Sequence, residues 1–166
     1  MLLAALLSDT VVLTSPTTTD RDHRVVEYLE ELLGLDARPF GMEMFEASSD
    51  ATDLDAAEIV GRDAKEYTTS SGHTIAIAQF ETVGPGLLER KDELLEALEA
   101  ERGQRDYAIY ALMVTDILSR GTELLVAGDT APLERAFGVE ARDRVLELPG
   151  VMSRKKQVAP KLLAAA

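Results

Sequence analysis

A run of cations near the C-terminus is the strongest candidate for chemistry in the sequence. Arg154–Lys156 follow Ser153, whose hydroxyl suits a helix start because it can accept a hydrogen bond from an unpaired N–H group. Cations are locally unfavourable there, since the start of a helix is partially positive. N–H groups and clustered Arg and Lys side chains together favour an anion, particularly phosphate. No Asp or Glu occurs from Leu148 onward, although the chain contains 30 of them. The segment therefore predicts a phosphate site rather than a solvated basic helix end.

A single carboxylate, Asp9, interrupts an apolar segment at the other end of the chain. Residues 1–13 predict a helix with apolar side chains on almost every face, which should be buried on most sides. An ionised carboxylate in such surroundings needs a partner, because removing water from a charge is costly. No Lys or Arg occurs before Arg21. From the pattern alone, Asp9 caps the helix end or lies at a break near Ser8 and Thr10.

Composition limits the kinds of partner. Hydrophobic residues make up 46% and charged residues 28%, which is typical of a globular chain. The net charge of -13 would repel nucleic acid or a free anion, so any anion site must be local. There is no Cys, which excludes thiolate metal ligands and fits a cytoplasmic protein. The apolar start lacks the features of a signal peptide, and no run approaches the ~20 residues that span a bilayer.

The elements before residue 54 are predicted to be helical. Ser15-Pro16 ends the first helix, because Pro disfavours helical backbone at the residue before it. Thr19, with Asp22 three residues later, resembles a capping box that begins a second helix, and Gly34 ends that helix. A short helix follows at 42–47. The small polar stretch 48–53 is the best candidate for a linker.

After this stretch, helices and strands alternate. The turn Ser70-Ser71-Gly72 indicates a hairpin, and the apolar run 107–115 is typical of a buried central strand. The predicted helices cover 56–61, 86–102, 132–137 and a final segment from Ser153. The predicted strands cover 64–68, 74–82, 107–115, 123–127 and 145–148. This order predicts an α/β fold, in which flanking helices cover a mixed sheet.

Five blocks together carry a family resemblance. They are Leu7–Thr10 with Ser15–Thr17, Asp63–Lys65, Ile77–Gln79, Val114–Leu118 and Ser153–Gln157. In this order the chain resembles the C-terminal portion of the family II, manganese-dependent inorganic pyrophosphatases, within the DHH phosphohydrolase family. The resemblance implies that residues 1–48 are the helical tail of the DHH catalytic domain, 49–53 a hinge, and 54–166 the substrate-binding domain.

The resemblance also implies roles for individual residues. Arg154, Lys155 and Lys65 would bind pyrophosphate, although Lys65 on its own would be interpreted as an exposed strand lysine. Fixed cations would stabilise charge on the leaving phosphate. Asp9 would be one ligand of a pair of Mn²⁺ ions, since oxygen ligands suit that metal. The supporting residues would be Ser153, Lys156 and Gln157.

The implied activity is hydrolysis of pyrophosphate to two phosphates by a full-length enzyme that forms a homodimer, with Mg²⁺ accompanying the substrate. The family takes its other metal ligands from an N-terminal domain, so we expect this chain alone to have little activity. His23 is expected on the surface, His73 in a loop, and Asp116 in a structural hydrogen-bonding role. Two alternatives stay open: an exopolyphosphatase-like enzyme, and a phosphate-binding module without catalysis.

Overall fold

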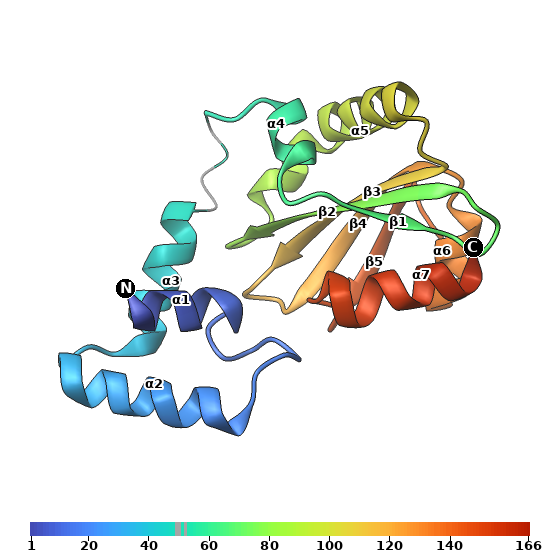
Figure 1. Ribbon diagram of the computed structural model, residues 1–166. Helices are drawn as coiled ribbons and strands as arrows, with labels where there is room; N and C mark the ends of the chain where they lie inside the picture. The colour runs from blue at the N-terminus through green and yellow to red at the C-terminus, as the bar shows by residue number, and fades with distance from the viewer. Residues whose placement is uncertain (49–50, 52) are drawn as a thin grey trace.

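The computed structural model describes residues 1–48, 51 and 53–166. Three helices come first, and a sheet with helices on both faces follows them (Figure 1). The N-terminal helices lie beside the sheet rather than in either of its helical layers. Their bounds are α1 Leu2–Asp9, α2 Asp20–Leu33 and α3 Ala37–Ser48.

The first helix is shorter and more exposed than predicted. It ends at Asp9, and only Leu3 and Leu7 are buried on it. The chain then turns through three residues in the left-handed region, since φ is 48°, 51° and 61° at 11–13. The buried hydroxyl of Thr10 supports the turn, because it donates to Leu6 O at 2.6 Å and accepts from Leu13 N at 3.1 Å. This turn, rather than Ser15-Pro16, ends the helix.

The second helix begins and ends as predicted. Thr19 and Asp22 form the reciprocal capping box, and Gly34 closes the helix with φ 63°. The third helix begins at Ala37, earlier than the predicted 42, because Pro39 in the first turn needs no N–H partner there.

A five-stranded sheet forms the centre of the molecule. Its strands are β1 Lys65–Thr68, β2 Thr74–Thr82, β3 Ile109–Asp116, β4 Gly121–Gly128 and β5 Val145–Pro149. They lie side by side in chain order. Only β2 and β3 pair in parallel, while the other neighbours are antiparallel. The predicted mixed sheet is therefore confirmed.

Helices cover both faces of this sheet, as Figure 1 shows. On one face, α4 (Ala56–Gly61), the short 3-10 turn Gly86–Arg90 and α5 (Lys91–Arg105) enclose one apolar core. On the other face, α6 (Ala131–Phe137) and α7 (Ala159–Ala165) enclose a second. The α/β class is confirmed. Within the described residues, no helix has the length and apolar character needed to cross a membrane.

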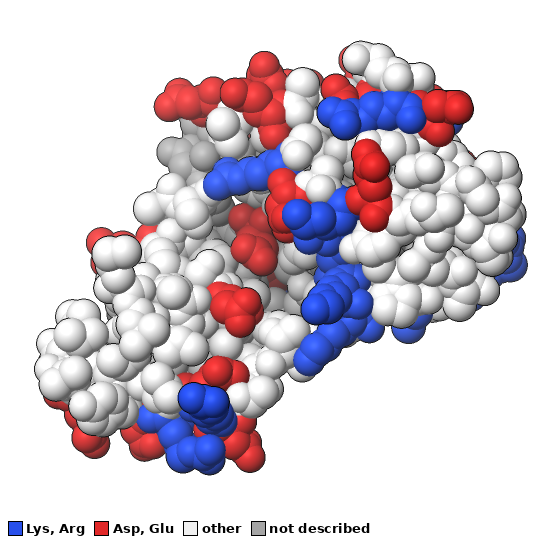
Figure 2. Space-filling model, viewed as in Figure 1, with Lys and Arg blue, Asp and Glu red and all other residues white. Residues whose placement is uncertain are grey.

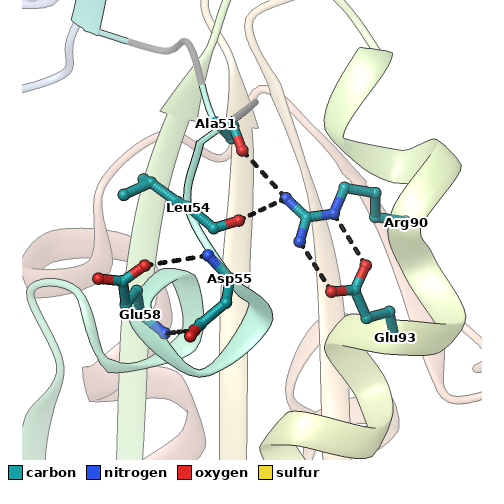
Figure 3. A network of polar contacts seen from close by, with 6 residues as sticks. All are labelled: Ala51, Leu54, Asp55, Glu58, Arg90 and Glu93. Carbon is teal, nitrogen blue, oxygen red and sulfur yellow. Dashed lines mark hydrogen bonds and ion pairs between the residues drawn. The ribbon is translucent and has the colours of Figure 1, made fainter.

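The predicted hinge at 49–53 lies mostly outside the described residues, and the domain division stays a prediction. Arg90 contacts one described residue inside this range and one just after it (Figure 3). Its Nη1 donates to the carbonyls of Ala51 and Leu54, each at 3.0 Å. Its other nitrogens form a two-pronged pair with Glu93. Arg90 thereby ties the approach to α4 to the start of α5.

A small apolar cluster joins the N-terminal helices to the sheet. Val11 and Phe45 pack with Ile117 and Met152, all of them buried. One polar contact crosses nearby, from Lys156 Nζ to the carbonyl of Pro16 at 3.2 Å. A polar hollow adjoins this cluster, since Phe45 also lines that hollow.

Candidate phosphate-binding site

The loop between β5 and α7 carries the cationic run. Gln157 shapes this loop, because its Oε1 accepts from the N–H groups of Met152 and Ser153, each at 2.9 Å. Its Nε2 donates to Gly150 O at 2.9 Å. Residues 154–158 then form a wide π-type turn, a feature often found at functional sites. Gln157 therefore holds the backbone of this loop, and its supporting role in substrate binding stays a prediction.

Arg154 points from this turn toward the start of β1. Its Nη2 lies 3.0 Å from Asp63 Oδ2, and its side chain is only 12% exposed. Its Nη1 donates to the backbone carbonyl of Asp63 and, at 3.4 Å, to that of Ile77. Arg154 is therefore anchored to two segments of the chain that lie far from it in sequence.

The same carboxylate binds a second cation. Lys65 Nζ lies 3.6 Å from Asp63 Oδ1, and the lysine side chain is 60% exposed. Two predicted substrate-binding cations thus share Asp63 in the structure, one fixed and one open to solvent. Lys65 alone would be interpreted as a solvated strand residue, but its neighbours place it beside Arg154.

The remaining members of the run differ from each other. Lys155 is exposed, and in the described part of the chain it has no hydrogen-bond or ion-pair partner. Lys156 is occupied by its contact with Pro16. Ser153 accepts from Lys156 N at 3.3 Å, as a helix cap does. Lys155 is therefore the member of the run that is free to meet a ligand.

A polar cleft of about 290 Å³ is lined by Asp63, the carboxylate that Arg154 and Lys65 share, and by one cation, Arg62. Its walls come from the N-terminal helices on one side and from the sheet on the other, and include Ser8, Phe45, Ser48, Asp63, Gln79 and Glu81. Figure 2 shows Lys and Arg side chains along the sheet side of a hollow between these two parts, with acidic side chains inside it. The cleft is large enough for a small polyanion.

Glu81 is the unusual carboxylate of this cleft. Burial raises its pKa above the ordinary value of 4.5, and the charge of Asp63 raises it further. Arg154 and Arg62 act in the opposite direction but do not cancel these effects. Glu81 therefore takes up a proton more readily than a solvated glutamate does, in a region where negative charge already gathers.

Asp9 lies at the end of α1, directly after Ser8 of the cleft wall. It is exposed, so the buried carboxylate that the apolar pattern predicts is not found, because the helix buries only one face. Among the described residues, no group of three or more His, Asp or Glu side chains is placed to hold a metal ion. Asp9 therefore has no described neighbours that would complete a metal site with it, and its role as a ligand stays a prediction.

Three other polar residues are separate from this site. Asp116 accepts hydrogen bonds from the N–H groups of Gly84, Leu118 and Ser119. Burial alone would raise its pKa, but these hydrogen bonds outweigh that effect and lower it. Its structural role is confirmed. His23 is exposed and His73 lies in a loop, both as predicted.

Sequence reasoning missed the centre of the site. Asp63 belongs to one of the five blocks, but nothing in its sequence neighbourhood indicates that it would pair with Arg154. Gln79, which donates to Met152 O at 3.2 Å, and Glu81 were likewise not singled out. The available signal was their alternation on β2, where every second residue near a strand end faces the same side.

Comparison with known proteins agrees with this architecture. The model of the DHHA2 domain matches residues 42–165, most of the chain. The chain belongs to the DHHA2 domain family. This match includes the sheet, both helical layers and the loop with Arg154.

Similar proteins share one name, manganese-dependent inorganic pyrophosphatase. A protein named probable manganese-dependent inorganic pyrophosphatase, from Lactobacillus helveticus, is 40% identical over 99% of this chain and 54% of its own length. The manganese-dependent inorganic pyrophosphatase of Methanocaldococcus jannaschii is 37% identical over 98% of this chain and 53% of its own. The DHHA2 chain thus spans about half the length of these relatives.

A solved structure shares the fold of the whole chain. The crystal structure of a family II inorganic pyrophosphatase from Methanococcus jannaschii superimposes with a TM-score of 0.89 and 37% sequence identity. The aligned region covers 99% of this chain and 54% of the solved chain. The resemblance to family II inorganic pyrophosphatases, predicted from the ordered blocks, is confirmed.

Proposed function

We propose that this chain is the pyrophosphate-binding part of a manganese-dependent inorganic pyrophosphatase, which hydrolyses pyrophosphate to two phosphates. The observation that carries the proposal is the convergence of Arg154 and Lys65 on Asp63, although Arg154 and Asp63 are 91 residues apart in sequence. Convergent cations around Asp63, a residue of the cleft wall, suit a compact polyanion. The names of the relatives support pyrophosphate as that anion.

The cations divide the work according to their surroundings. Arg154 is held in place, so it provides a fixed charge that needs little reorganisation when an oxyanion binds. Lys65 and Lys155 are exposed and can follow the ligand as point charges. Together they would bind both phosphates and stabilise the charge that develops on the leaving one. The net charge of -13 makes this local concentration necessary.

For the metal, we propose that Asp9 contributes one carboxylate to a Mn²⁺ pair whose other ligands lie outside this chain. When bound, such a pair activates a water molecule and holds the phosphates, and Mg²⁺ can accompany the substrate. Because Asp9 has no neighbouring ligands among the described residues, no hydrolytic step is assigned to this chain alone. With Mn²⁺ present, it should therefore release little phosphate from pyrophosphate.

Calorimetric titration with pyrophosphate tests the clamp. Wild-type chain should bind, and Arg154→Ala should weaken binding at least about tenfold, since a lost charge-assisted contact costs about 1.5–3 kcal/mol. Arg142→Ala removes one exposed arginine charge elsewhere and should bind like wild type. Equal affinity of wild type and Arg154→Ala would contradict the clamp, and near-native phosphate release by this chain would contradict the metal assignment.

A further inference from the structure

The hydrogen bonds of Arg154 leave one edge of its guanidinium group free. An arginine side chain carries five N–H donors, arranged on an end edge and a side edge. Asp63 takes the end edge, because its carbonyl accepts from Nη1 and its carboxylate lies beside Nη2. Ile77 O takes the second hydrogen of Nη1. In the described part of the chain, Nε has no partner, so the side edge of Nε and Nη2 remains available.

Asp63 is held in a position that serves this arrangement. Its φ is 48°, in the left-handed region that few residues other than glycine adopt, although Asp tolerates it better than most. In this conformation both its carboxylate and its own carbonyl reach the same guanidinium group. Unusual backbone conformations of this kind gather at functional sites.

We propose that Asp63 is a positioning residue, which fixes the Arg154 guanidinium so that its side edge faces the bound phosphate. This rests on the proposed function. A side edge with two parallel N–H groups matches two phosphate oxygens, which gives Arg its advantage in phosphate recognition. Without Asp63, the long side chain would sample many rotamers, and ordering it would oppose binding. Asp63 also holds Lys65 close to Arg154, offsetting the repulsion between the two cations.

The same residue has an opposing effect. Its negative charge repels a phosphate, so a carboxylate that merely neutralised Arg154 would weaken binding. If the positioning effect dominates, removing the Asp63 side chain weakens phosphate binding. If the charge repulsion dominates, removing it strengthens binding. Asp63→Gly is the appropriate deletion, because glycine adopts the positive φ without strain. Asp63→Asn keeps an oxygen that can accept from Nη2 and removes only the charge.

The experiment is calorimetric titration of the whole chain with pyrophosphate. Asp63→Gly should weaken binding about tenfold, while Asp63→Asn should stay within about threefold of wild type. If Asp63 acts through Arg154, adding Asp63→Gly to Arg154→Ala should cause no further loss, because changes acting through one group are not additive. Asp92→Ala, an exposed aspartate on α5, controls for charge, and thermal unfolding of each variant controls for folding.

Each outcome decides a separate point. The positioning role is overturned if Asp63→Gly binds pyrophosphate at least as tightly as wild type while Arg154→Ala binds it weakly. That result would leave the proposed clamp intact. Equal losses from Asp63→Gly with and without Arg154 would show that Asp63 does not act through that residue. Normal binding by Arg154→Ala would instead overturn the proposed function itself. Should Asp63→Gly fail to fold, Asp63→Ser removes the carboxylate and supports the same comparison.

Discussion

The raised pKa of Glu81 should make the stability of the folded protein depend on pH. Its carboxyl is partly buried beside Asp63, so its pKa in the folded protein is raised, first by burial and then by that neighbouring charge. A raised pKa means that the folded state holds the proton more strongly than the unfolded state. The resulting stabilisation is fully present below the ordinary value of 4.5 and is lost as pH rises through the folded value.

Glu81→Gln should therefore be more stable than wild type at neutral pH. Glutamine stays uncharged, so the variant avoids the cost of a partly buried charge near Asp63. Urea unfolding of both proteins between pH 4 and pH 8 should show the stability difference widening as pH rises. Glu96→Gln, an exposed position on α5, controls for the loss of one charge. A difference that is constant with pH would contradict this account of Glu81.

Individual roles could be predicted only where a residue type is informative by itself. The Arg154 run was visible because cations begin a helix in an acid-free segment, and Gln157 followed from the motif. The role of Asp63 could not be predicted, because it depends on the pairing of β1 with β2 and on the loop after β5. A sequence window that contains Asp63 has no information about Arg154.

At the scale of elements, the turn after α1 depends on close packing against α3. Gly41 is buried on α3, and a Cβ atom placed there would lie 2.9 Å from Val12 Cγ2 and 3.4 Å from Leu7 Cδ1. Real Cβ atoms essentially never lie within 3.0 Å of another heavy atom, so a methyl group at residue 41 would force the Val12 side chain to shift. This contact positions the end of α1, where Asp9 lies.

Gly41→Ala should destabilise the protein by about 1–3 kcal/mol, the usual cost of overpacking. Most of that loss should be recovered when Val12→Ala is added, since the nearest contact is with the Val12 side chain. Val12→Ala alone provides the reference for the double-mutant cycle, and Gly103→Ala, which meets no neighbouring atom, controls for glycine in a helix. Additive free energies of unfolding would show that the two positions do not interact.

The elements themselves were largely predictable, and their ends less so. Alternation and helical period located every strand and most helices, because those patterns reflect burial that the sequence records directly. The left-handed turn at 11–13 was missed, since two valines and a leucine give no signal for positive φ. The early start of α3 was also missed, since the predicted helix began at 42, although Pro39 fits the first turn of a helix.

At the scale of the whole molecule, two parts meet across the cleft with few contacts. The sheet and its layers contain two large apolar cores, whereas the cluster that joins the N-terminal helices to the sheet has only four buried members. Arg90 ties the chain before α4 to the start of α5, within the part that holds the two large cores. The weaker region is thus the one that carries Asp9.

Phe45→Ala tests this imbalance. Phe45 is 2% exposed and is the largest side chain of the joining cluster, so its truncation should cost roughly 3 kcal/mol or more. Because the loss falls on the contact between the parts, amide hydrogen exchange should accelerate in α1–α3 and remain nearly unchanged in β3 and β4. Phe137 lies on the far face of the sheet, in the core that α6 and α7 cover. Phe137→Ala should therefore accelerate amide hydrogen exchange in α6 and α7 rather than in α1–α3. Equal acceleration throughout the chain in Phe45→Ala would mean that both parts unfold as one unit, in which case Asp9 is held as firmly as Arg154.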